Sequence, residues 1–197
     1  TAGVKPLPTA APGSEPARAA DRCHVDGAGF RSLMSSFPTG VTVVTSTGRD
    51  GSPRGVTCSS LSSVSLDPPT LLVSLKTHGS TLDAIRSGGR FAVNLLHARA
   101  RRTAEVFASP VEDRFAHVSW RPTGAARLPR LVEDAFAVAE CAVSSLFDVG
   151  DHTVVLGEVA AVDVRPGVPL LYGLREFSAW PATGRDHRAD RTRGIPR

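Results

Sequence analysis

The stretch "VTVVTSTGRDGSPRGVTCSS", residues 41–60, decides the fold because two strand-like segments flank a tight turn. Residues 41–46 are all Val, Thr or Ser, and residues 54–60 carry a further Val-Thr pair, a composition that favours extended backbone. Between them, Asp50-Gly51 is a strong signal for the turn of a β-hairpin. The stretch therefore predicts two neighbouring antiparallel strands.

The following sequence continues as strands with a few short helices. Further strands are predicted over residues 70–75, 90–96, about 135–147 and about 153–165. One helix is predicted from Ser80 to Gly88-Gly89, and another over residues 98–108 with Ala104 and Phe107 facing the core. Successive strands with helices only at intervals favour a mainly antiparallel β-barrel over a doubly wound parallel sheet.

An additional helix is predicted before the hairpin. Phe30, Leu33, Met34 and Phe37 recur at helical spacing after Asp26, a residue type that often caps helices. We expect this apolar stripe to belong to the core.

Length and composition indicate one globular domain. The chain has 197 residues, of which 41% are hydrophobic. Residues 1–24 are predicted to be a disordered arm without the apolar segment of a signal peptide, residues 25–182 the domain, and residues 183–197 a basic disordered tail. No membrane span is predicted. Three widely spaced cysteines without a C-x-x-C pair argue against a disulfide framework or a metal site, and they suit the cytoplasm.

The net charge of +4 does not by itself indicate a nucleic-acid-binding protein. Residues 185–197 hold five Arg against two Asp, so much of the excess lies in the tail. We therefore expect no nucleic-acid partner. A weaker alternative, in which the Arg-rich tail binds nucleic acid or a partner enzyme, predicts strongly salt-dependent binding.

The segment "GVTCSSLSSVSLDPP", residues 55–69, is unusually rich in small polar side chains. Six hydroxyl-bearing residues and one thiol occur within residues 55–65, where a strand is expected to become a loop. Hydroxyls in such a place add donors and free backbone N–H groups, which suits a flat heteroaromatic ligand with several acceptors. The alternative is a polar barrel rim with ordinary turn hydrogen bonds.

The segment "KTHGSTLD", residues 76–83, places Lys76 and two hydroxyls at a predicted helix start. The N-terminus of a helix offers unpaired N–H groups and the positive end of the helix dipole, which favour a phosphate group. Ser80 is equally compatible with a simple helix cap.

The order of the motifs resembles that of the short-chain flavin reductases, the small NAD(P)H:flavin oxidoreductases that serve two-component monooxygenases. The resemblance covers about residues 28–178 and combines T-x-S-S-x-x-S-V-S-x-x-P-P with G-D-H. It is carried by "FRSLMSSFPTGVTVVTS" (30–46), "GVTCSSLSSVSLDPPTLLVSL" (55–75), "RFAVNLL" (90–96), "DRF" (113–115), "ECAV" (140–143), "GDHTVVLGEV" (150–159) and "PLLYGLREF" (169–177). It implies an FMN-binding split β-barrel, antiparallel and Greek-key-like, with a few short peripheral helices.

The resemblance also implies roles for individual residues. Those expected to line the flavin ring are Thr57, Ser59, Ser60, Leu61 and Ser62, with Cys58 inside this run but without assigned chemistry. Those expected to hold the flavin phosphate are Lys76, Ser80 and Thr81. Asn94 would contact the flavin from a neighbouring strand, and Arg114 with Phe115 would close the site. His152, in the Gly150-Asp151-His152 motif, would lie beside the nicotinamide.

The implied reaction is hydride transfer from C4 of NADH or NADPH to N5 of FMN or FAD, in which the cofactor rings supply the reactivity. The implied partners are a second copy of the chain, forming a homodimer, and a flavin-dependent monooxygenase that receives reduced flavin by diffusion. The alternative is a non-catalytic flavin-binding or sensory module built on the same barrel.

Overall fold

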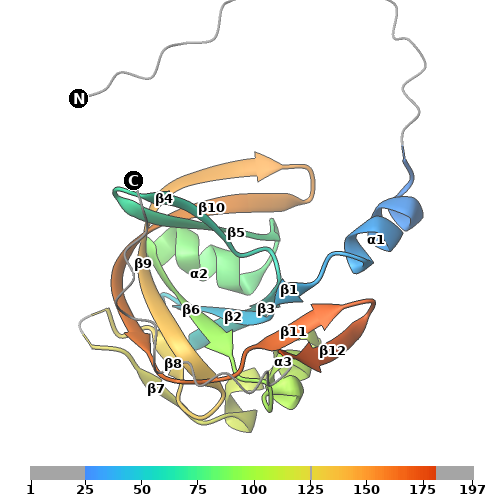
Figure 1. Cartoon of the computed structure of the whole chain (residues 1–197). Helices are drawn as coiled ribbons and strands as arrows, with labels where there is room; N and C mark the ends of the chain where they lie inside the picture. Colours follow the sequence, from blue (N-terminus) through green and yellow to red (C-terminus); the bar gives the residue numbers. More distant parts are fainter. Residues whose placement is uncertain (1–24, 125, 181–197) are drawn as a thin grey trace, which may run out of the picture. The chain divides into compact units, whose positions relative to one another are not determined.

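The computed structural model describes residues 25–124 and 126–180 (Figure 1). The predicted arm at 1–24, the predicted tail at 183–197 and the last two residues of the predicted domain lie outside the described residues. Among the described residues, no helix is both long and apolar enough to cross a membrane.

The chain divides into one unit up to Met34 and a second from Ser35 onward. The described part of the first unit contains most of helix α1 (Gly27–Ser35), which Asp26 caps by accepting the Gly29 N–H at 2.7 Å. The expectation that its apolar stripe belongs to the core is wrong, because Phe30 and Leu33 are 58% and 67% exposed. Helical spacing identifies an apolar face but does not identify what covers it.

A seven-stranded sheet dominates the second unit. Its strand order is β3-β2-β6-β9-β10-β5-β4, and every neighbouring pair is antiparallel. The strands are β2 (Thr42–Thr47), β3 (Pro53–Cys58), β4 (Ser62–Leu66), β5 (Pro69–Lys76), β6 (Arg90–Leu96), β9 (Ala135–Val149) and β10 (His152–Val164). The predicted hairpin is β2–β3, with Gly51 at φ +76° in its turn. The mainly antiparallel β fold is therefore confirmed.

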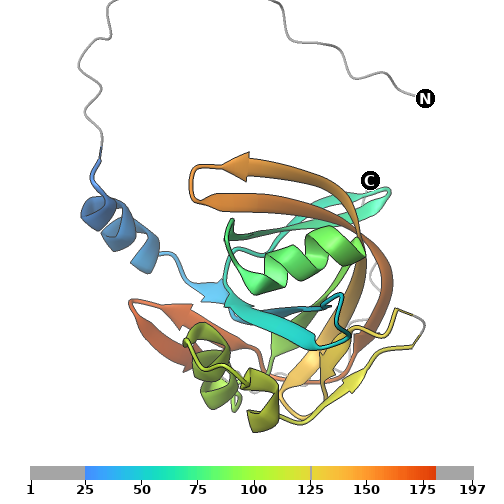
Figure 2. The same ribbon diagram turned by 180° about the vertical axis from the view of Figure 1, so that it is seen from behind.

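Smaller elements complete the unit (Figure 2). One further sheet consists of β1 (Thr39–Gly40), β11 (Leu170–Gly173) and β12 (Glu176–Ala179), and another of β7 (Trp120–Pro122) and β8 (Pro129–Leu131). The helical elements are α2 (Ser80–Gly88), α3 (Arg101–Ala108) and the 3-10 helix η1 (Arg114–His117).

Two apolar clusters form the core. In one, Leu82 and Ile85 of α2 pack against Val73, Phe91 and Val155 of the sheet. The amphipathic face of α2 therefore covers the concave side of the sheet, where Figures 1 and 2 place this helix. In the other, Ala104 and Phe107 of α3 are fully buried, as predicted, together with Phe115. The Phe107 and Phe115 rings meet edge to face, with centroids 5.0 Å apart.

Ser60 joins the end of β3 to β5, which lies elsewhere in the order of the sheet. Its hydroxyl donates to the Ser74 carbonyl at 2.9 Å and accepts the Ser74 N–H at 2.8 Å. These two bonds give the Ser74 N–H and carbonyl a partner on the segment that follows β3. Ser60 therefore helps to hold the curved sheet closed, and its hydroxyl is committed to that role.

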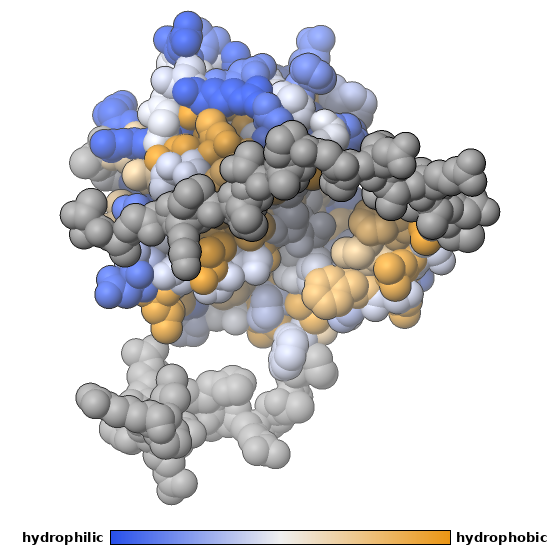
Figure 3. Space-filling model, turned by 90° about the horizontal axis from the view of Figure 1, so that it is seen from above, coloured by the Kyte–Doolittle hydropathy of each residue, from blue (hydrophilic) through white to orange (hydrophobic). Residues whose placement is uncertain are grey.

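Large apolar side chains remain on the surface of the second unit. Val64 and Leu66 on edge strand β4 are 49% and 89% exposed, and Phe147 and Val149 of β9 are 53% and 61% exposed. Hydrophobic areas are visible in orange on the face seen in Figure 3. Exposed apolar surface of this kind is typical of protein contacts.

Asn94, predicted to contact the flavin, has a structural place in the sheet. Asn94 is fully buried in β6, where its amide donates to the Val43 carbonyl at 3.1 Å and to Thr45 Oγ1 at 3.2 Å. Its carbonyl oxygen accepts the Leu131 N–H at 2.9 Å. Because both ends of the amide are committed, Asn94 fastens β8 to the main sheet.

We predict that Asn94→Ala lowers the free energy of unfolding by about 1–3 kcal/mol, because it leaves the buried Leu131 N–H without its acceptor. Urea unfolding measures this loss, with Ser178→Ala on exposed strand β12 as the control truncation. Flavin affinity of the folded Asn94→Ala protein should equal that of the native protein. A selective loss of flavin affinity without a loss of stability would instead support the predicted flavin contact of Asn94.

Candidate active site

The pairing of β5 with β10 brings two distant motifs together. Lys76, the last residue of β5, lies directly opposite His152, the first residue of β10. Opposite residues of an antiparallel pair point to the same face, with their Cβ atoms about 4.5–5.5 Å apart. Just beyond the ladder, the Thr77 N–H donates to the Asp151 carbonyl at 3.0 Å. The predicted phosphate-binding segment and the G-D-H motif are therefore neighbours.

The G-D-H motif forms the turn between β9 and β10. Gly150 adopts φ +60°, a conformation that favours glycine. The Asp151 carboxylate lies 2.8 Å from His152 Nδ1, and this hydrogen bond is the main reason why the pKa of Asp151 is below its ordinary value. Electrostatic attraction to Lys76, and to the His152 imidazole when it is protonated, lowers it further.

The Asp151–His152 contact selects one tautomer of the imidazole. An ionised carboxylate can only accept a hydrogen bond, so Nδ1 of His152 must carry the proton. Nε2 of the neutral ring is then left as an acceptor. The His152 side chain is 40% exposed, so this acceptor is within reach of a ligand.

The start of α2 follows Lys76 closely. Helix α2 has nine residues from Ser80, and Gly79 at its N-cap provides no side-chain cap bond. The N–H groups of the first turn therefore lack a side-chain acceptor, which suits a phosphate oxygen. Ser80 is exposed, whereas Thr81 is only 3% exposed. The Thr81 side chain therefore contributes to packing, and its backbone is the part suited to a ligand.

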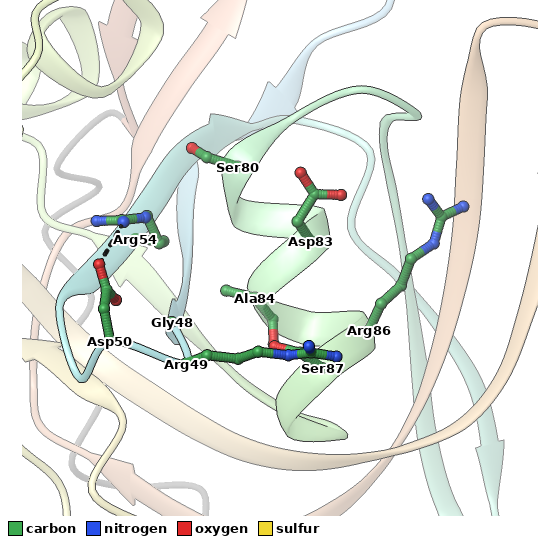
Figure 4. Close-up of a pocket in the computed structure, with 9 residues that line it drawn as sticks. All are labelled: Gly48, Arg49, Asp50, Arg54, Ser80, Asp83, Ala84, Arg86 and Ser87. Atoms are coloured by element: carbon green, nitrogen blue, oxygen red, sulfur yellow. Dashed lines mark hydrogen bonds and ion pairs between the residues drawn. The ribbon is translucent and has the colours of Figure 1, made fainter.

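Two adjoining cavities share Arg54 and Ser80. One, of about 470 Å³, is lined by Gly55, Ser80, Arg114 and Phe115 among others, so it brings together residues predicted separately. The other, of about 570 Å³, lies between α2 and the β2–β3 turn (Figure 4). Its lining residues are Gly48, Arg49, Asp50, Arg54, Ser80, Asp83, Ala84, Arg86 and Ser87.

Arg114 and Phe115 anchor η1 beside the first of these cavities. The Arg114 guanidinium donates to the Gly55 carbonyl at 2.8 Å and to the Ser109 carbonyl at 2.6 and 3.1 Å. Phe115 is 7% exposed and packs between the rings of Phe107 and Trp120. Arg114 therefore places a positive charge at the cavity wall, while Phe115 acts mainly in the core.

The predicted ring-binding residues divide between ligand-facing and structural positions. Thr57 and Ser59 line a cavity of about 440 Å³ with the aromatic pair Tyr172 and Phe177. Ser59 and Leu61 line a smaller one of about 130 Å³. Thr57 also donates to the Ala104 carbonyl at 2.6 Å. Ser62 is exposed at the start of β4.

Cys58 and Ser60, in contrast, have structural positions, with side chains that bond within the protein. Cys58 is 5% exposed, and its Sγ lies 3.0 Å from Ser60 Oγ. Since Ser60 also bonds Ser74, two residues before Lys76, it connects the 57–62 segment to the Lys76–His152 pair.

Several residues at these cavities belong to none of the motifs predicted from the sequence to form the site. Arg54 lines both cavities beside Ser80, and its ion pair with Asp50 appears in Figure 4. Tyr172 and Phe177 face Thr57 from the β11–β12 hairpin. Arg54 directly precedes Gly55, where the structure shows that a Cβ would lie 2.7 Å from the Phe107 ring.

The comparisons with known proteins identify the family. Residues 34–181 match the model of the flavin reductase like domain. The chain belongs to this family. It is 55% identical over 161 residues to "Flavin reductase (NADPH)" of Lentzea aerocolonigenes, which covers 82% of this chain and 94% of that protein. The resemblance in the sequence and the class of enzyme that it implied are thereby confirmed.

Two further similar proteins have names that describe a reductase or an oxidoreductase. The chain is 35% identical over 172 residues to "Flavin-dependent monooxygenase, reductase subunit HsaB" of Mycobacterium tuberculosis, covering 83% of this chain and 90% of that one. The structure of "Streptomyces globisporus C-1027 NADH:FAD oxidoreductase SgcE6 in complex with NAD and FAD fragments" superposes with a TM-score of 0.76 at 34% identity, over 81% of this chain and 96% of that chain. The split-barrel fold is confirmed with it.

We predict that Asp151→Asn weakens binding of the nicotinamide substrate. An amide can donate to Nδ1 of His152, and this favours the tautomer in which Nε2 is a donor. The KM for NADH should rise about two- to tenfold, the value of one neutral hydrogen bond. Stopped-flow flavin reduction measures the effect, and Asp163→Asn at the other end of β10 is the control. Unchanged reduction kinetics would contradict the role of Asp151 in setting the His152 tautomer.

Proposed function

We propose that this chain reduces FMN or FAD with NADH or NADPH and releases the reduced flavin to a flavin-dependent monooxygenase. The observation that carries the proposal is that Lys76 and His152 lie opposite each other where β5 and β10 meet, with the uncapped start of α2 four residues after Lys76 in the chain. It joins a place suited to a phosphate with an oriented imidazole, within a chain that belongs to the flavin reductase family.

The donor set fits a flavin nucleotide. When bound, the flavin would supply a ring system that accepts hydride. Lys76 and the first-turn N–H groups of α2 would hold its phosphate, with Ser80 as a hydroxyl donor. Thr57, Ser59 and Leu61 would contact the flat ring from the cavities at the end of β3, where polar and aromatic groups meet.

His152 would orient the second substrate. Its Nε2, held as an acceptor by Asp151, is suited to the carboxamide N–H of the nicotinamide. This contact contributes alignment, and alignment of two reacting rings is the main demand that hydride transfer makes on a protein. A proton-transfer role for His152 is not required.

The cellular location and the partner enzyme belong to the same proposal. We propose a cytoplasmic location, which suits the free thiols of Cys58 and Cys141. Burial raises the pKa of Cys141 to about 12, so this thiol stays neutral at physiological pH. The monooxygenase partner is supported by the relative from Mycobacterium tuberculosis, whose name describes a monooxygenase reductase subunit.

The deciding experiment measures NADH and NADPH oxidation by the purified chain with and without added FMN or FAD. We expect oxidation to depend on flavin. A protein that binds flavin but oxidises neither nucleotide would be the non-catalytic flavin-binding or sensory module instead.

We predict that Lys76→Ala weakens FMN binding by about 1–2 kcal/mol, roughly five- to thirtyfold, because an exposed charge-assisted contact to phosphate is lost. Riboflavin, which has no phosphate, should bind the variant and the native protein equally. Fluorescence titration with both flavins measures this difference. Equal weakening for FMN and riboflavin would show that Lys76 does not contact the phosphate.

We predict a homodimer, in which a second copy covers apolar side chains such as Leu66 and Phe147 that a single chain exposes. Sedimentation at micromolar concentration should give twice the mass of the chain. A monomer under these conditions would contradict the prediction.

A further inference from the structure

We propose that Arg86 and Asp148 are positioning residues that fix the His152 turn against the loop between Lys76 and Ser80. This inference rests on the proposed function, because it concerns the alignment of the nicotinamide with the flavin. Neither residue lies in a motif of the family resemblance. Both act through their neighbours and need no contact with substrate.

Arg86 reaches from the last turn of α2 to the β9–β10 hairpin. Its Nη2 donates to Asp148 Oδ1 at 2.9 Å and to Thr153 Oγ1 at 3.2 Å. Its Nη1 approaches the Thr77 carbonyl at 3.4 Å. In Figure 4 the Arg86 side chain extends away from the side of α2 that carries Ser80, toward a neighbouring strand.

Thr153 is the centre of this network. It is fully buried, and its hydroxyl donates its one proton to Asp148 Oδ1 at 2.6 Å. Its oxygen is therefore available to accept from Arg86 and from the Thr77 hydroxyl, which lies 3.3 Å away. The network thus closes with compatible donors and acceptors.

The network joins segments that carry the proposed ligand groups. Thr77 follows Lys76, Thr153 follows His152, and Arg86 belongs to the helix whose start includes Ser80. The β5–β10 ladder ends at the Lys76–His152 pair, so beyond it the turn is held by the Thr77–Asp151 backbone bond and by this side-chain network. Loss of Arg86 would remove the side-chain hydrogen bonds that link α2 to Asp148 and Thr153 of the hairpin.

The exposure of the Arg86–Asp148 ion pair indicates that it contributes more to the position of the His152 turn than to the stability of the fold. The side chains of Arg86 and Asp148 are 34% and 66% exposed, and ion pairs of this kind contribute little to folding. Small displacements of reacting groups, in contrast, reduce rates strongly. Variants of the pair should therefore stay folded while ligand alignment suffers.

The test compares Arg86→Ala, Asp148→Ala and the double variant with the native protein. The matched control is Arg130→Ala, which removes another Arg–Asp pair, to Asp163, from the far end of β10. Hydrogen exchange of the Thr77 amide in flavin-free protein reports the turn directly. Stopped-flow flavin reduction over a range of NADH concentrations reports alignment.

We expect Thr77 exchange to accelerate in Arg86→Ala and Asp148→Ala but not in Arg130→Ala. The apparent KM for NADH or the limiting reduction rate should worsen by about two- to tenfold, the value of one or two hydrogen bonds. The double variant should be no worse than either single variant, because the two residues act as one unit. The thermal midpoint should change little.

Unchanged Thr77 exchange in Arg86→Ala, or faster exchange with unchanged reduction kinetics, would overturn the positioning role. Additive losses in the double variant would also contradict it. A native protein that oxidises neither NADH nor NADPH in the presence of flavin would instead overturn the proposed function, while the exchange measurement would still decide whether the network holds the turn.

Discussion

The register between β5 and β10 is the constraint on which the proposed site depends. Val73 and Val155 lie opposite each other in this pair and are both fully buried. Because side chains alternate between the two faces of a strand, this buried pair fixes Lys76 and His152 on the other face. A slip of one residue in either strand would turn that strand's member of the pair toward the core. Hydrophobic packing therefore sets the geometry of a polar site.

Close packing inside the barrel supports that register. Gly157 of β10 lies opposite Leu71 of β5, and a Cβ at Gly157 would meet Phe91 at 2.5 Å. The absence of a side chain there gives Phe91 its fully buried position. Ser60 adds a polar constraint by bonding both backbone groups of Ser74, close to Lys76. The 57–62 segment is thereby tied to the strand that ends at the site.

Local sequence patterns predicted much of the fold but not the partners of individual polar groups. The Asp50-Gly51 turn, the start of α2 at Ser80 and the buried positions of Ala104 and Phe107 all follow from short-range signals. Asn94 does not, because its partners lie on β2 and β8, far away in the sequence. Ser60 resembles its hydroxyl neighbours in sequence, and only the curvature of the sheet distinguishes its structural role from that of Ser59.

In the proposed site, the end of the β5–β10 pair at Lys76 and His152 holds the flavin phosphate and the nicotinamide as neighbours. The most direct measurement is amide chemical-shift mapping of the isotopically labelled chain, titrated first with FMN and then with NAD⁺. We expect FMN to shift the amide signals of residues 57–62 and of the α2 start, and NAD⁺ then to shift those of residues 150–153. Binding of either ligand without shifts at these segments would contradict it.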